Sequence, residues 1–185
     1  TPEKSFFIRM ITRDIDLDDC ILDLLDNSID GAKRVLQAEG RHEDENDRFS
    51  EFSVDIYLDD DRFEISDNCG GITLDDARDY AFHFGRRREV DREPEESIGI
   101  YGIGMKRAMF KIGRDVMVLS STADEAFEVH VDVEEWEEAE RWEFPLETRE
   151  PWEEPGTDIV IEQLNEGVGD DFDTTSFQND LRKTI

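Results

Sequence analysis

The sequence predicts an α/β (α+β) protein with a single hydrophobic core, in which helices alternate with the strands of a mixed sheet. Residues 16–38 have the spacing of an amphipathic helix, with apolar side chains three and four positions apart. Several later stretches alternate between apolar and polar residues, as half-buried strands do. The chain has 185 residues, a length for which one domain is the usual organisation.

The chain is strongly acidic, with 50 Asp and Glu against 21 Lys and Arg and a formal net charge of -29. Such a field opposes non-specific binding to nucleic acid or to an anionic membrane, so we expect neither as a partner. Two explanations stay open: a surface adapted to high salt, or an acidic surface that faces a partner. The acids are spread along the whole chain rather than gathered in a tail, which favours the first.

Composition also limits the compartment and the chemistry. Cys20 and Cys69 suggest neither a disulfide framework nor a zinc site. No stretch approaches the roughly 18 apolar residues of a membrane span, and no secretory signal opens the chain. We therefore expect a cytoplasmic domain. Because the first residue is Thr1 rather than Met, we also expect it to be part of a longer protein.

The first elements are a lead-in and a long helix. Residues 5–15 form a short apolar segment, which we interpret as an edge strand or a strap over the core. The helix at 16–38 has Asp16 or Asp18 as its cap and ends at Gly40. Its polar residues Asp23, Asn27 and Asp30 share one face, which is either a plain wet surface or a functional stripe. We expect the opposite face to be buried, and it consists of Leu24, Leu25, Ile29, Ala32, Val35 and Leu36.

A predicted hairpin follows, with strands at 52–60 and 62–67. Its second strand leads directly into residues 67–72, Asp-Asn-Cys-Gly-Gly-Ile. A carboxylate at a strand end, followed by two glycines, lets the backbone approach a flat ligand closely, although the same residues also fit a plain turn. Residues 73–84 then predict a capped amphipathic helix.

Residues 85–96 are polar and aperiodic, which predicts a loop. The basic run in this loop, residues 86–88, either attracts phosphate or balances nearby acids. The glycines at 99, 102 and 104 then open a helix whose free N–H groups suit an anion. Lys106 adds a cation to the first turn of that helix.

The remainder of the chain predicts three more strands, at 115–122, 126–133 and 158–164. Between the last two strands, the segment that holds all three Trp residues predicts a short helix or an irregular cover with aromatic anchors. Residues 173–185 predict a terminal helix with Phe177 and Leu181 on its apolar side.

Four motifs therefore occur in order: an acid-xxx-Asn-xx-Asp helix, an Asp-Asn-x-Gly-Gly turn, a Gly-xx-Gly-x-Gly helix start and a Gly-Thr strand. In this order they resemble the GHKL ATPases (gyrase B, the ninety-kilodalton heat-shock chaperone, histidine kinases and MutL) over residues 17–163. The form IGIYGIGMKRA looks more like the microrchidia and chaperone branches. The resemblance implies a Bergerat fold, a two-layer sandwich with a mixed, mostly antiparallel sheet and helices on one face. It divides the chain into an ATP-binding domain, 1–165, and a C-terminal tail with a short helix, 166–185.

The resemblance also implies roles for the polar stripe of the first helix. Asn27 matches the asparagine whose side-chain oxygen binds Mg²⁺, and Asp23 matches the residue that orients or deprotonates the attacking water. Most relatives have Glu at the position of Asp23, and Asp is one methylene shorter. Asp30 is expected among the nucleotide-binding residues.

For the nucleotide itself, Asp67 matches the carboxylate that accepts a hydrogen bond from the adenine amino group. Cys69 replaces the first glycine of the usual Asp-x-Gly-x-Gly motif, whereas Gly71 keeps the second position. Residues 85–97 correspond to a mobile lid, and Lys106 is a candidate phosphate contact. The other expected nucleotide-binding residues are Ile72, Gly99, Tyr101, Gly102, Ile103, Gly104, Met105 and Thr157.

The resemblance predicts an ATPase that binds ATP and Mg²⁺, closes its lid, and drives a nucleotide-dependent homodimer or the rearrangement of a larger protein. Slow hydrolysis would reset this switch. A module that senses nucleotide without hydrolysis is one alternative, which the shorter Asp23 keeps open. A histidine-kinase-type catalytic domain is another, and an acidic interaction protein with accidental glycine motifs is the last.

Overall fold

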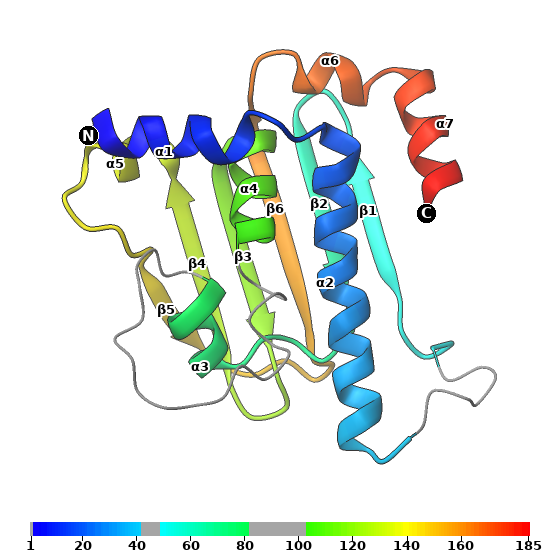
Figure 1. Ribbon diagram of the computed structural model, residues 1–185. Coiled ribbons are helices and arrows are strands. Elements are labelled where there is room, and N and C mark those ends of the chain that lie inside the picture. Colours follow the sequence, from blue (N-terminus) through cyan, green and yellow to red (C-terminus); the bar gives the residue numbers. More distant parts are fainter. Residues whose placement is uncertain (1, 42–48, 82–102) are drawn as a thin grey trace.

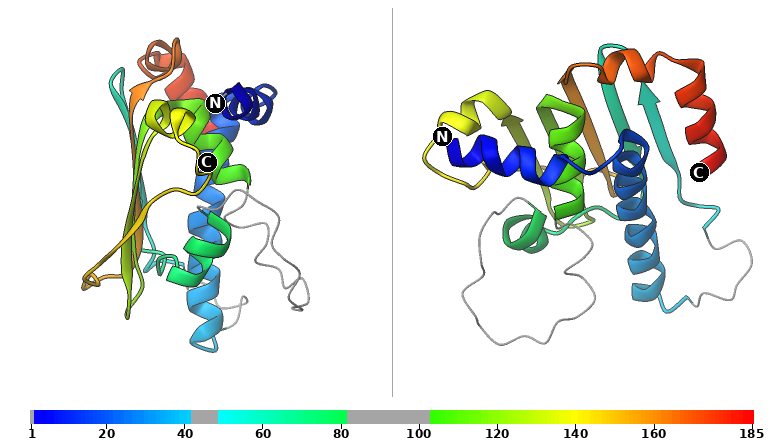
Figure 2. Two further views of the ribbon diagram at one scale, coloured as in Figure 1. Left: turned by 90° about the vertical axis from the view of Figure 1, so that its left-hand side faces the viewer. Right: turned by 45° about the horizontal axis from the view of Figure 1, so that its top comes forward.

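The computed structural model describes residues 2–41, 49–81 and 103–185. They form two layers, a six-stranded sheet and a layer of helices packed on one of its faces (Figures 1 and 2). The buried apolar side chains lie between the layers. The expected two-layer sandwich with helices on one face is confirmed.

The sheet has the strand order β1-β2-β6-β3-β4-β5, and every pairing between the described strands is antiparallel, where the sequence allowed for a mixed sheet. The last strand enters the middle of the sheet and pairs with β2 on one side and β3 on the other. This insertion brings the ends of distant segments together. The strands are β1 (Val54–Leu58), β2 (Arg62–Asp67), β3 (Gly113–Ser121), β4 (Ala126–Asp132), β5 (Leu146–Arg149) and β6 (Gly156–Leu164).

The helical layer is organised around α2 (Leu17–Ala38), which packs beside α4 (Ile103–Ile112) against the sheet (Figure 2). The sequence predicted α2, its first residue follows Asp16, and Gly40 ends it with φ of +69°. The other helices are α1 (Pro2–Thr12), α3 (Leu74–Asp76), the π-helix η1 (Ala77–Ala81), α5 (Val133–Glu138), α6 (Val168–Phe172) and α7 (Thr175–Thr184). No helix within the described ranges is long and apolar enough to cross a membrane.

The lead-in is a helix, α1, so its interpretation as an edge strand or strap was wrong. Phe7, Ile8 and Ile11 pack against the core. Their spacing is that of a helix, but the segment is too short for this pattern to be recognised in the sequence. The buried Lys4 Nζ donates hydrogen bonds of 2.6–2.7 Å to one backbone carbonyl within α5, that of Trp136, and to two carbonyls that follow α5. It also lies 4.5 Å from the centre of the Trp136 ring. A contact of this kind, between residues more than 130 positions apart, leaves no local sequence pattern.

The buried face of α2 is rotated from the expected one. Its buried residues are Leu17, Cys20, Ile21, Leu24, Ser28, Gly31, Ala32 and Leu36, whereas Ile29 is exposed. The reason is that α2 contacts both the sheet and α4, so the buried stripe faces both neighbours. Asp23 and Asn27 consequently lie at the margin of the buried face, half-buried, and not opposite it.

In three other segments the structure differs in part from the prediction. The Trp-rich segment contains α5 and the short strand β5, which the sequence did not predict because three of its four residues are exposed. Thr73 caps the next helix as expected, with its hydroxyl accepting from the Asp76 N–H, but the helix continues as a π-helix, and residues 82–84 lie outside the described part. The tail forms α7 after an unpredicted α6, and both pack against the core through Phe172 and Leu181.

Candidate functional site

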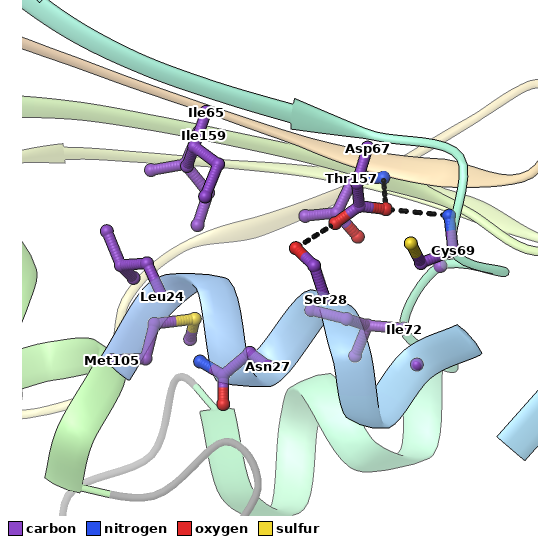
Figure 3. Close-up of a pocket in the computed structure, with 12 residues that line it drawn as sticks. Leu24, Asn27, Ser28, Ile65, Asp67, Cys69, Ile72, Met105, Thr157 and Ile159 are labelled. Carbon is purple, nitrogen blue, oxygen red and sulfur yellow. Dashed lines mark hydrogen bonds between the residues drawn. The ribbon is translucent and has the colours of Figure 1, made fainter. Parts of the chain in front are cut away.

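A pocket opens between α2 and the inner face of the sheet, where β2 ends and β6 begins (Figure 3). It holds about 380 Å³ of empty space, counting the solvent at its mouth. Most of its wall is apolar, with a few polar groups. The lining residues are Leu24, Asn27, Ser28, Gly31, Ile65, Asp67, Cys69, Gly71, Ile72, Met105, Thr157 and Ile159.

Asp67 is the main polar group of the pocket. It is the last residue of β2 and lies opposite Thr157 in the register of β2 and β6. Its Oδ1 accepts hydrogen bonds from the backbone N–H groups of Cys69 (2.9 Å) and Thr157 (3.2 Å), and its Oδ2 accepts one from the Ser28 hydroxyl (2.6 Å; Figure 3). Burial raises the pKa of this carboxyl, and the three hydrogen bonds oppose that rise because they favour the ionised form.

The turn after Asp67 requires glycine at position 71. Gly71 has φ of +72°, and a Cβ at this position would lie 2.0 Å from the carbonyl oxygen of Ser121. The turn therefore packs directly on the end of β3. The next residue, Ile72, is buried in the pocket wall, and its N–H donates to the Ser120 hydroxyl at 2.8 Å. Ser120 also bonds the Thr157 hydroxyl at 2.8 Å, so the turn, β3 and β6 form one hydrogen-bonded unit.

Cys69 takes the position that a glycine holds in the motif, and its side chain is buried in the pocket wall. Burial raises the pKa of its thiol to about 12, so the sulfur is neutral at physiological pH and packs as a small apolar group. Cys20 is also buried and free, so there is no disulfide between the two.

The polar stripe of α2 divides between the pocket and the surface. Asn27 lines the pocket, and its Nδ2 is buried with no hydrogen-bond partner among the described residues. Asp23, one turn earlier, lies beside the pocket, and its Oδ2 accepts a hydrogen bond of 2.7 Å from Arg107 Nη2. Asp30 does not line the pocket, and its carboxylate lies 3.4 Å from Lys33 Nζ at the surface.

The start of α4 supplies the remaining expected residues that the structure describes. Met105 is buried in the pocket wall, and Gly104 is adjacent to Asp23, because a Cβ on Gly104 would lie 3.6 Å from Asp23 Oδ2. Lys106 is buried, and this burial lowers its pKa to about 8. Ile103 points outward and is 64% exposed. Gly99, Tyr101, Gly102 and the lid segment at 85–97 lie outside the described residues.

The pocket therefore combines apolar walls with a fixed carboxylate at one end and an unsatisfied amide at the other (Figure 3). A flat heterocycle with an amino group fits the first end, since a carboxylate accepts from an N–H donor. The side-chain oxygen of Asn27 is a hard donor of the kind that Mg²⁺ prefers, so the residues present fit this metal together with an anionic ligand.

Comparison with known families agrees with this geometry. Residues 15–166 match the family described as histidine kinase-, DNA gyrase B-, and HSP90-like ATPase, which covers most of the chain. The chain belongs to this ATPase family. A comparison with curated proteins finds no match.

Three residues whose polar side chains lie at or beside the site were not predicted from the sequence: Ser28, Ser120 and Arg107. Ser28 had a usable signal, because it lies four positions after Leu24 on the buried stripe of α2, and a buried hydroxyl needs a partner. Ser120 also lies at a buried position of an alternating strand. Arg107 follows Lys106 directly, but its contact with Asp23 spans 84 positions and depends on how α4 packs against α2.

Proposed function

We propose that this domain binds ATP together with Mg²⁺ in the pocket between α2 and the sheet, hydrolyses it slowly, and uses the bound nucleotide as a conformational or dimerisation switch in a larger protein. The observation that carries the proposal is the fixed carboxylate of Asp67 at the closed end of an apolar pocket. Membership of an ATPase family supports the same assignment.

Selectivity for adenine follows from the acceptors of Asp67. Each carboxylate oxygen has two lone pairs, and Oδ2 accepts only the Ser28 hydroxyl among the described residues, which leaves capacity for the exocyclic amino group of adenine. Guanine presents a carbonyl oxygen in the corresponding position, which the carboxylate repels. Ile72, Met105 and Leu24 supply the apolar surfaces between which the base lies.

The phosphates lie toward α4 in this proposal. Mg²⁺ neutralises phosphate charge and orients the chain of phosphates, and Asn27 holds it through its side-chain oxygen. Lys106 approaches the phosphates from the first turn of α4, with the backbone N–H groups of Ile103, Gly104 and Met105. Asp23 orients the attacking water and accepts its proton.

A module that senses ATP without hydrolysis is the second candidate, and one observation favours it. The carboxylate of Asp23 is on a side chain one methylene shorter than the Glu that most relatives have at this position. In that case nucleotide binding alone drives the rearrangement. Phosphate release that disappears in Asp23→Ala, while ATP binding survives, distinguishes the two functions.

The direct test is calorimetric titration of the full chain with Mg-ATP and Mg-GTP in molar potassium chloride. We expect binding of ATP but not GTP, and at least about tenfold weaker ATP binding in Asn27→Ala, because charge-assisted contacts contribute about 1.5–3 kcal/mol. Asp158→Asn is the matched control, since Asp158 adjoins Thr157 but bonds Ser66 rather than lining the pocket. Failure of a folded wild-type sample to bind ATP would contradict the proposal.

A further inference from the structure

An ion pair between Arg107 on α4 and Asp23 on α2 joins the two helices beside the pocket. Arg107 Nη2 lies 2.7 Å from Asp23 Oδ2, and the two side chains are 35% and 32% exposed. Ion pairs with this much solvent access contribute little to stability. The pair is therefore better explained by what it does to the Asp23 carboxylate than by what it adds to the fold.

The packing around Arg107 fixes the orientation of its guanidinium group. Its Nε is buried and has no hydrogen-bond partner among the described residues, so the stem is packed at some cost in free energy. The guanidinium is planar, so fixing the stem also fixes the direction in which Nη2 points. Because α4 packs along α2, the position of Nη2 relative to the α2 backbone is set by helix packing.

The contact engages only one oxygen of the carboxylate. Oδ2 of Asp23 faces Arg107 and also the backbone of Gly104, whereas no hydrogen bond to Oδ1 is found among the described residues. Fixing Oδ2 restricts both side-chain torsions of Asp23. Oδ1 is thereby held in a defined direction and keeps its capacity to accept a hydrogen bond from water.

We propose that Arg107 is a positioning residue for hydrolysis, which holds Oδ2 of Asp23 so that Oδ1 receives the attacking water. The inference rests on the proposed ATPase function and deepens it. A carboxylate on a short side chain loses activity when it is misplaced by about 1 Å, and a rigid neighbour prevents that loss.

The step that Arg107 serves is the attack of water on the terminal phosphate. The water oxygen forms a bond to the γ-phosphorus, and the bond between that phosphorus and the β–γ bridging oxygen breaks. ADP leaves with the electron pair of that oxygen. One water proton stays on the phosphate product, and the other passes to Asp23 Oδ1 and then to solvent.

The test compares Arg107→Met, Arg107→Lys and wild type in steady-state ATP hydrolysis and in the affinities for Mg-ATP and Mg-ADP. Arg114→Met is the matched control, because Arg114 forms a similar part-exposed pair at 3.0 Å, but with Glu137 and not with Asp23. We expect Arg107→Met to lower kcat about tenfold to a hundredfold, with both affinities within about twofold of wild type. Arg107→Lys restores part of the rate because it restores the cation, and Arg114→Met leaves the rate unchanged.

The outcomes separate cleanly. Hydrolysis at the wild-type rate in Arg107→Met overturns the inference and leaves the proposed function standing. A selective loss of ATP over ADP affinity also overturns it, because Arg107 would then contact the γ-phosphate. If the wild-type protein binds ATP but does not hydrolyse it, both the proposed hydrolysis and the positioning role of Arg107 are wrong. If Arg107→Met does not fold, Arg107→Gln replaces it, because it also removes the cation, and the same rate and affinities are expected.

Discussion

The two ends of the pocket are built differently. At the strand end, Asp67 is bonded by Ser28, Cys69 and Thr157, and Ser120 ties the turn to β6. At the helix end, Asn27 Nδ2 and Arg107 Nε are buried without hydrogen-bond partners among the described residues. The polar groups of the strand end are already hydrogen-bonded to one another, whereas the helix end keeps two buried N–H donors without partners among the described residues. In the proposed function, the strand end would therefore select the base and the helix end would respond to the bound nucleotide.

The largest effect is expected from a change that distorts the strand end. Gly71→Ala places a Cβ 2.0 Å from the Ser121 carbonyl oxygen, at a φ of +72°, so the turn must move. We expect the free energy of unfolding to fall by about 3 kcal/mol or more in urea denaturation. Gly40→Ala is the control, since its φ is +69° but no atom lies within 4 Å of the added Cβ. Its cost should be about 1 kcal/mol, and equal losses in the two variants would show that the turn is not tightly packed.

A smaller effect, of opposite sign, is expected at the helix end. Asn27→Leu removes a buried amide that lacks a partner, so we expect the nucleotide-free protein to become more stable by about 1 kcal/mol while it loses Mg-ATP binding. Ser28→Ala, at the next position, removes a satisfied hydroxyl and should be destabilising by about 1 kcal/mol. Urea unfolding of both variants measures the contrast. Destabilisation by both would contradict the distinction between the two ends.

The smallest effect concerns the protonation of Lys106. Its pKa is about 8 in the free protein because of burial, and nearby phosphate would raise it. ATP binding at pH 8.5 should therefore take up roughly half a proton or more. Calorimetry in buffers of different ionisation enthalpy measures this uptake, and Lys106→Met should abolish it. Binding without proton uptake would show that Lys106 does not meet the phosphates.

The same pKa gives a dependence of stability on pH. The unfolded state binds more protons than the folded state between pH 8 and 10.5, so the contribution of Lys106 makes the protein more stable as pH rises through this window. The thiols of Cys20 and Cys69 have the opposite sign from about pH 9 to 12, because burial raises their pKa to about 12. The difference between wild type and Lys106→Met isolates the lysine.

The sequence predicted the parts of the fold that carry local patterns. The helix α2, the hairpin of β1 and β2, and the turn at residues 67–72 each have a periodicity or a glycine placement that is readable over a few residues. It did not predict β5, whose exposed residues do not alternate, or α1, which is fixed partly by the distant contacts of Lys4.

The residues of the site likewise divide into those with a local sequence pattern and those without one. Asp67 and Asn27 were found because each belongs to a motif, and the structure places both in one pocket. The expected opposite-face position of Asn27 was wrong because α2 contacts α4 as well as the sheet. Arg107 could not be identified from the sequence, since its role depends on the packing of two helices and not on a spacing along the chain.

The most direct test of the account is the nucleotide preference of Asp67→Asn. The new side chain keeps an oxygen for the N–H groups of Cys69 and Thr157, so the fold is retained, but it presents an N–H donor in place of Oδ2. Calorimetry should show ATP binding weakened at least about a hundredfold, with the ratio of ATP to GTP affinity shifted toward GTP. Unchanged ATP affinity and an unchanged ratio in the folded variant would contradict the claim that Asp67 reads the base.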